Sequence, residues 1–206
     1  ALIGCAVLTG VGAVLFTARA EPGCTVAVFG VGGVGLNVVQ GATLVNAARI
    51  FAIDTHPRKL EFARRMGATD AILATDGDPV REIVARTGGR GVDYAFEAIG
   101  LPETMAQAFA CLAKGGTAVA IGVAPTEAQV AVPARALVYG ERVLRGSFYG
   151  SARPRTDFGR MVDLYLAGRL RLDDLVTRTY ALEAIDTAFD HLAAGELARG
   201  LIRFEA

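Results

Sequence analysis

Residues 25–54 read TVAVFGVGGVGLNVVQGATLVNAARIFAID, and this stretch decides the fold. Its first five residues form a short apolar, β-branched run, which is typical of a buried strand. The glycine-rich turn that follows is predicted to open a helix reaching about Ala47. A second strand is predicted over residues 49–53 and ends at Asp54. A strand, a helix and a parallel strand in this order form a βαβ unit.

The glycines of this unit match the spacing G-x-G-x-x-G at Gly30, Gly32 and Gly35. Gly30 is expected to make the tight turn, Gly32 to admit a pyrophosphate close to the backbone, and Gly35 to pack the helix on the strand. Gly33 and Val34 complete the motif at the helix start, where free N–H groups would face the phosphates. The motif predicts a dinucleotide site. The alternatives are a glycine-rich turn without a ligand and a methyltransferase, which also has a glycine loop after its first strand.

Asp54 bears on which nicotinamide dinucleotide is bound. A carboxylate at this place accepts hydrogen bonds from the adenosine ribose and would repel a 2′-phosphate, which favours NAD over NADP. The alternative is that Asp54 caps the helix predicted to begin at Pro57, and one carboxylate can do both. Of the two basic residues nearby, Lys59 is interpreted as a second ribose contact and Arg58 as solvated.

The rest of the chain continues the alternation of strands and helices. Further helices are predicted over residues 57–66, 79–87 and 102–113, and further strands over residues 71–73, 92–97 and 117–121. The strands are apolar throughout, as expected for a parallel sheet that is covered on both faces. The pattern predicts an α/β fold with a doubly wound parallel sheet of the Rossmann type.

Two later strand ends are candidates for the other half of a dinucleotide. Ala98-Ile99-Gly100 and Ile121-Gly122-Val123 follow predicted strands, and ligands bind at the carboxyl ends of parallel strands. Small residues there leave room for a nicotinamide ring and its ribose, which makes Ile99 and Val123 candidate cofactor contacts. Ordinary turn glycines are an equally good interpretation of the spacing alone.

After residue 122 the pattern changes. Strands are predicted over residues 129–132 and 142–148 around a short helix, then helices over 156–167 and 183–193 and strands over 176–180 and 201–204. The last segment is too small to be an independent domain, so we expect it to pack on the sheet or on another part of a larger protein. We divide the chain into a helix at residues 1–20, a dinucleotide-binding domain at 21–149 and a C-terminal segment at 150–206.

Composition excludes several classes of partner. The chain has 206 residues with 21 basic and 21 acidic side chains, so its net charge of zero gives no attraction for nucleic acid or an anionic membrane. Its three cysteines form no C-x-x-C pair, which fits a reducing cytoplasm. Residues 2–18 are uncharged and end in Ala18-Arg19-Ala20, as a signal peptide would. No basic segment precedes them and glycines interrupt them, so a buried helix is favoured over a signal peptide or a membrane span.

Five stretches together resemble the zinc-dependent, medium-chain alcohol dehydrogenases. They are IGCAVLTGVGA at residues 3–13, VFGVGGVGLNVVQGA at 28–42, AIDTHPRK at 52–59, FEAIG at 96–100 and GELARGLIRF at 195–204. The likeness covers the whole chain in order, and it is greatest to the glutathione- or thiol-dependent formaldehyde dehydrogenase branch and its actinobacterial relatives.

The resemblance implies roles that the residues alone do not show. Cys5 stands where the family has a ligand of its catalytic zinc, whose open fourth position takes the alcohol oxygen. Arg199 would bind the cofactor pyrophosphate and Lys59 the adenosine ribose. Val34 would pack behind the nicotinamide, and main-chain groups at Val123 and Tyr149 would hold its carboxamide. The strand near residues 142–148 is similar to the one through which family members pair as dimers.

The resemblance also indicates that the chain is a fragment, because family members are nearly twice as long. The second cysteine and the histidine that complete their zinc site lie in the part absent here, and one ligand cannot build a site that needs three. His56 is interpreted as solvated and His191 as a surface or packing residue. We therefore expect the tail at 150–206 to be a small α+β segment of an incomplete catalytic domain, whose apolar face is exposed or used in oligomer contacts.

The sequence is compatible with three functions. The first is the NAD-binding portion of a cytoplasmic, homo-oligomeric, zinc- and NAD-dependent alcohol dehydrogenase, a dimer or tetramer, acting on a primary alcohol or a thiol–formaldehyde adduct and inactive as this fragment. The second is a zinc-free medium-chain reductase that uses NADPH, against which Asp54 and Cys5 argue. The third is a dinucleotide-sensing module without enzymatic activity.

Overall fold

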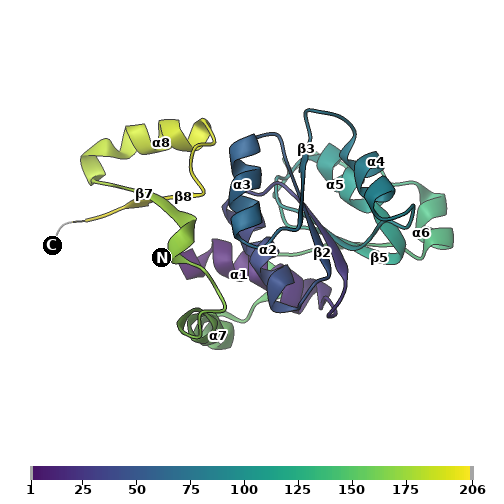
Figure 1. Ribbon diagram of the computed structural model, residues 1–206, viewed down its shortest axis with the longest axis horizontal. Coiled ribbons are helices and arrows are strands. Elements are labelled where there is room, and N and C mark those ends of the chain that lie inside the picture. The colour runs from purple at the N-terminus through teal and green to yellow at the C-terminus, as the bar shows by residue number, and fades with distance from the viewer. Residues whose placement is uncertain (1, 205–206) are drawn as a thin grey trace.

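The protein is built around a six-stranded sheet in the order β3-β2-β1-β4-β5-β6, as Figure 1 shows for this computed structural model. The structure describes residues 2–204. The strands of this sheet are β1 (Thr25–Phe29), β2 (Arg49–Asp54), β3 (Asp70–Leu73), β4 (Val92–Glu97), β5 (Leu112–Ala120) and β6 (Val143–Gly146). Every neighbouring pair is parallel, and the order reverses between β1 and β4. This confirms the doubly wound parallel sheet predicted from the sequence.

Helices cover both faces of the sheet. The α-helices are α1 (Ala6–Gly12), α2 (Gly33–Leu44), α3 (Pro57–Arg65), α4 (Pro79–Arg86), α5 (Pro102–Ala110), α6 (Ala134–Gly140), α7 (Pro154–Leu166) and α8 (Ile185–Ala193), of which α8 lies away from this sheet. One core joins the sheet to α1, α2 and α3, and the other joins it to α4, α5 and α6. Strand β1 shows why its sequence is apolar throughout, because Val26 and Val28 enter the first core while Ala27 and Phe29 enter the second.

The uncharged opening segment is buried, as predicted, but it is not one regular helix. A 3₁₀ turn at Leu2–Gly4 precedes α1, and a π-helical segment at Ala13–Ala18 follows it and ends at Arg19, which has φ +53°. Helix α1 packs against α2, where a Cβ on Gly10 would lie 2.5 Å from the carbonyl oxygen of Val34. Within residues 2–204, no helix has both the length and the apolar character needed to cross a membrane.

Two predicted elements were wrong. The helix predicted over residues 102–113 ends at Ala110, and β5 begins at Leu112 and includes the glycine pair that was expected to close the helix. The reason is a shift of register between β4 and β5, which accommodates the glycines inside the strand instead of a loop. The strand predicted over residues 129–132 does not form, because these residues run as a partly exposed loop into α6 and pair with no strand.

The C-terminal segment forms a second, two-stranded parallel sheet from β7 (Val176–Tyr180) and β8 (Arg199–Ile202). Figure 1 shows α8, β7 and β8 at the end of the molecule opposite α6. The segment packs on the larger sheet domain, as predicted, since Arg171 donates its backbone N–H to Gln40 (2.7 Å) and a guanidinium N–H to the carbonyl of Arg65 (2.6 Å). Helix α8 keeps an apolar side exposed, where Phe189 and Leu192 line a hollow beside β8.

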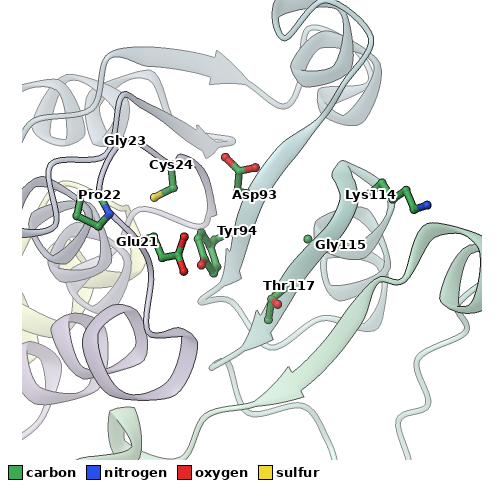
Figure 2. A pocket seen from close by; sticks show the side chains of 10 residues that line it. Glu21, Pro22, Gly23, Cys24, Asp93, Tyr94, Lys114, Gly115 and Thr117 are labelled. Carbon is green, nitrogen blue, oxygen red and sulfur yellow. The ribbon is translucent and has the colours of Figure 1, made fainter.

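Asp93 ties together the amino ends of β1 and β4. Its carboxylate accepts hydrogen bonds from the backbone N–H and the hydroxyl of Thr25, at 2.8 and 2.7 Å, and from Arg90 at 2.8 Å. Burial would raise the pKa of this carboxyl, but the bonds from Arg90 and Thr25 outweigh burial and lower the pKa below its ordinary value. Figure 2 shows Asp93 beside Tyr94, Glu21 and Cys24 at the edge of a polar pocket.

We expect Asp93→Asn to lower the free energy of unfolding at pH 7 by about 1 kcal/mol, since both Asp93 and Arg90 are partly exposed. The pKa of this carboxyl is lower in the folded than in the unfolded state. Its contribution is therefore complete above about pH 4 and is lost as the pH falls through the folded-state value. Urea unfolding should show the gap between wild type and variant narrowing from pH 7 towards pH 3. A difference in free energy of unfolding that does not change with pH would contradict this account. Asp76→Asn, which changes an exposed acid, is the control.

Candidate functional site

The candidate site lies at the carboxyl ends of β1, β2, β4 and β5, at the edge of the sheet opposite the Asp93 pocket in Figure 2. In a doubly wound sheet, the strand order reverses at a crevice outside these ends, and ligands bind there. The reversal here falls between β1 and β4, so the turn after β1 is at the centre of the site. The amino-end pocket is therefore not the cofactor site, although it is a well-formed hollow.

The turn after β1 is shaped by close contacts between main-chain atoms. Gly30 has φ +83° and donates its N–H to the carbonyl of Ile53 at 2.8 Å, which turns the chain sharply out of β1. A Cβ on Gly35 would collide with the carbonyl oxygen of Gly30, so only glycine lets α2 start this close to the strand. A Cβ on Gly32, the N-cap of α2, would meet nothing within 4 Å. The structure thus leaves space at the place where the motif predicts a pyrophosphate.

Arg199 reaches this turn from β8. Its guanidinium lies against Gly33, where a Cβ would collide with it. The Nε atom is buried and has no hydrogen-bond partner. A buried donor without an acceptor is costly, and here it lies beside the N-terminus of a helix, where anions are favoured. The arrangement fits a phosphate group, which would accept from both the guanidinium and the helix N–H groups.

Asp54 is held rigidly at the end of β2 and is only 8% exposed. Its Oδ2 accepts the N–H of Val31 at 3.0 Å, and its Oδ1 accepts the N–H of His56 at 3.1 Å. The ammonium of Lys59 lies 3.9 Å from Oδ1, while Arg58 is exposed, as predicted. His56 is the N-cap of α3 and no side chain caps this helix, so the capping interpretation of Asp54 was wrong. Each carboxylate oxygen has two lone pairs, which leaves capacity for ribose hydroxyls.

A turn of the C-terminal segment also borders this side of the site. A Cβ on Gly195 would lie 3.1 Å from Cδ2 of His56 and 3.4 Å from Cε of Lys59. This neighbour is not predictable from the sequence, because nothing in the residues near 195 indicates that they lie beside α3. His56 itself is exposed on its other side, as predicted.

The turns after β4 and β5 meet each other across the sheet edge. The side chain of Ile99 lies against Gly30, where a Cβ would collide with its Cγ1. Gly100 has φ +98°, and a Cβ there would lie 2.6 Å from the carbonyl oxygen of Val123. Ile99 and Val123 are both exposed at this edge, so the structure brings the two predicted contacts together. Glu97, which ends β4 just before this turn, is fully buried, and its burial was not predicted from the sequence.

Tyr149 and Cys5 lie near each other, although 144 positions separate them in the sequence. The Tyr149 hydroxyl donates to the carbonyl of Gly4 at 2.7 Å, and Cys5 follows as the exposed N-cap of α1. Among residues 2–204, no three His, Cys, Asp or Glu side chains gather as metal ligands would. The described residues therefore do not fit a complete zinc site.

His191 packs in the C-terminal segment, with its Nδ1 2.8 Å from the Tyr180 hydroxyl.

Comparison with known proteins identifies relatives of this chain. The family model described as zinc-binding dehydrogenase matches residues 33–167. The S-(hydroxymethyl)glutathione dehydrogenases of Synechocystis sp. and Escherichia coli are each 42% identical over 205 residues, which is 98% of this chain and 55% of the relative. The chain thus spans about half the length of the curated relatives it matches.

Solved structures agree with the sequence matches. An alcohol dehydrogenase zinc-binding domain protein from Burkholderia ambifaria superposes with a TM-score of 0.94 at 34% identity, covering 99% of this chain and 55% of that one. Benzyl alcohol dehydrogenase from Acinetobacter calcoaceticus gives a TM-score of 0.94 at 29% identity, covering 98% and 56%. These likenesses favour the dehydrogenase interpretation of the glycine motif over the methyltransferase alternative.

Two glycines of the turn make a matched pair for a stability test. We expect Gly35→Ala to lower the free energy of unfolding by about 1–3 kcal/mol, because the added methyl group overpacks against Gly30. Gly32→Ala should cost only about 0.5 kcal/mol or somewhat more, since its methyl group enters open space and only the N-cap preference for glycine over alanine is lost. Urea unfolding measures both. Equal stability of the two variants would show that close packing at Gly35 does not constrain the turn.

Proposed function

The chain belongs to the zinc-binding dehydrogenase family, and we propose that it is the NAD-binding portion of an oxidoreductase. The full enzyme would move a hydride between NAD and a primary alcohol or a thiol–formaldehyde adduct. The observation that carries the proposal is the pairing of the glycine turn with the buried, unpartnered Nε of Arg199. The thiol adduct is supported by relatives that are named S-(hydroxymethyl)glutathione dehydrogenases.

Each half of the cofactor has its own set of residues in this proposal. The pyrophosphate lies over Gly32 and Gly33 and accepts from Arg199 and the first N–H groups of α2. Asp54 and Lys59 hold the adenosine ribose on the β2 side of the turn.

The nicotinamide half lies on the other side of the turn, over the ends of β4 and β5. Val34 packs behind the ring, Ile99 and Val123 border it, and main-chain groups near Val123 and Tyr149 bind the carboxamide. This placement is supported by the exposure of Ile99 and Val123 at the same edge. It also places the nicotinamide towards Cys5, since Tyr149 is bonded to the neighbouring Gly4.

We propose that Cys5 serves as one zinc ligand in a longer protein, with the other ligands supplied by residues outside these 206. Bound zinc would hold the alcohol oxygen and lower its pKa. This chain supplies at most one thiolate at that place, so it is expected to bind NAD without oxidising alcohol. Residues 150–206 would complete the catalytic domain, which is supported by the exposed apolar side of α8.

Calorimetric titration with NAD⁺ and NADP⁺ tests the cofactor assignment. We expect NAD⁺ to bind at least about tenfold more tightly, because the Asp54 carboxylate would repel a 2′-phosphate. Asp54→Asn removes the charge and keeps the size, so it should narrow this preference for NAD⁺, while Asp163→Asn, which changes an exposed acid on α7, should not. Arg199→Ala should weaken both dinucleotides, since both carry the pyrophosphate. Tighter binding of NADP⁺ by wild type would favour the NADPH-dependent reductase instead.

The edge of the large sheet supports a homo-oligomer, most simply a dimer. All four residues of β6 are exposed, and an edge strand presents unpaired N–H and C=O groups to another chain. Val138 and Tyr139 on the adjoining α6 add exposed apolar area. We also propose a cytoplasmic location, supported by three free cysteines that a reducing compartment keeps as thiols.

Sedimentation analysis tests this interface. We expect wild type to dimerise and Leu144→Lys on β6 to shift it towards monomer, because pairing would bury the new charge. Leu166→Lys places the same charge on exposed apolar surface of α7 and should leave the dimer intact. If Leu166→Lys dissociates the protein and Leu144→Lys does not, association uses the C-terminal segment instead of β6.

A further inference from the structure

Glu97 is a buried carboxylate at the last position of β4, with none of its surface exposed. Its Oε1 accepts hydrogen bonds from the backbone N–H groups of Ile99 (3.0 Å) and Gly100 (2.8 Å). It also accepts from the N–H of Leu101 at 3.4 Å and from the hydroxyl of Thr104 at 2.7 Å. One carboxylate oxygen thus accepts the hydrogen bonds that fix the conformation of the turn between β4 and α5. The other oxygen, Oε2, is buried and has no partner.

The turn that Glu97 fixes is in contact with the turns after β1 and β5. Ile99 projects from it onto Gly30 of the turn after β1. Gly100 lies against the turn after β5, where a Cβ on Gly122 would collide with the backbone nitrogen of Gly100. The main chain of Glu97 contributes as well, because its carbonyl accepts the N–H of Ile121 at 2.8 Å. A shift of the Glu97 side chain would therefore move Ile99 relative to the glycine turn.

The order of the strands determines which half of a bound dinucleotide would lose contacts if this turn shifted. Asp54 ends β2 on one side of β1, whereas Glu97 ends β4 on the other side. If the pyrophosphate lies over the turn after β1, the adenosine lies towards β2 and the nicotinamide towards β4. The donors to the Glu97 side chain all follow β4, in the turn on the nicotinamide side and in the first turn of α5.

We propose that Glu97 is a positioning residue for the nicotinamide half of the cofactor site. It holds the turn at residues 98–101 so that Ile99 borders the ring, without touching the cofactor itself. The inference rests on the proposed function and extends it to a residue buried behind the site. An acceptor oxygen at Oε1 is what the turn requires. A glutamine would keep that oxygen and place its amide nitrogen where Oε2 has no partner.

The test compares the affinity for NAD⁺ with the affinity for ADP, which carries the adenosine and both phosphates but no nicotinamide. We expect Glu97→Ala to lower the affinity for NAD⁺ by about tenfold, because a set of buried hydrogen bonds is lost. The affinity for ADP should stay within about twofold of wild type. Glu97→Gln should recover most of the NAD⁺ affinity, because it keeps the acceptor. Thr104→Val, which removes one donor, should weaken NAD⁺ by about threefold. Glu103→Gln changes an exposed acid on the same helix and is the control.

The outcomes separate this inference from the function on which it rests. If wild type binds neither NAD⁺ nor ADP, the cofactor assignment fails. If wild type binds both, two results would overturn the inference. Glu97→Ala could lower the affinities for NAD⁺ and ADP equally, or it could leave both affinities unchanged, and in either case Glu97 has only a structural role. Circular dichroism shows whether Glu97→Ala folds. If it does not, Thr104→Val decides, because a proportionate loss of both ligands in that variant overturns the inference in the same way.

Discussion

The contact on which the rest of this structure depends is between Gly35 and the carbonyl oxygen of Gly30. Because the two backbones touch, α2 begins directly at the end of β1, and its first N–H groups face the centre of the sheet edge. That centre is also where the strand order reverses, so β2 and β4 flank it with Asp54 on one side and Glu97 on the other. A side chain at Gly35 would push the helix away and remove the anion site and its two borders together.

The sequence predicts the fold well where local chemistry and burial agree. Strand β1 has the predicted bounds, and the parallel order follows from strict alternation of strands and helices. Prediction fails where local signals and pairing disagree. Gly115 and Gly116 are typical of a loop, yet β4 draws them into β5 through a shifted register. Residues 129–132 include strand-forming valines but pair with no strand of the sheet, so they stay irregular.

The residues of the candidate site also differ in how far the sequence predicts them. Gly30, Gly35 and Asp54 were predictable because a few consecutive residues specify a turn, a close approach and a strand end. Arg199 was identified only through the likeness to a family, since no spacing indicates that β8 delivers it to Gly33. Glu97 carries a weak signal, a charged residue ending an apolar strand, and its importance lies in four donors that only the folded turn brings together.

The C-terminal segment links the cofactor site to the surface that remains apolar. It contributes Arg199 at the phosphate position and Gly195 beside Lys59. Its anchoring is uneven, because no residue of α8 is buried, whereas Leu170, Leu175 and Ala198 enter the first core. Phe189 and Leu192 line a hollow beside Arg199 of β8, so the apolar side of α8 and the phosphate contact share one strand. The cofactor site therefore depends on the packing of β8 as well as on the turn after β1.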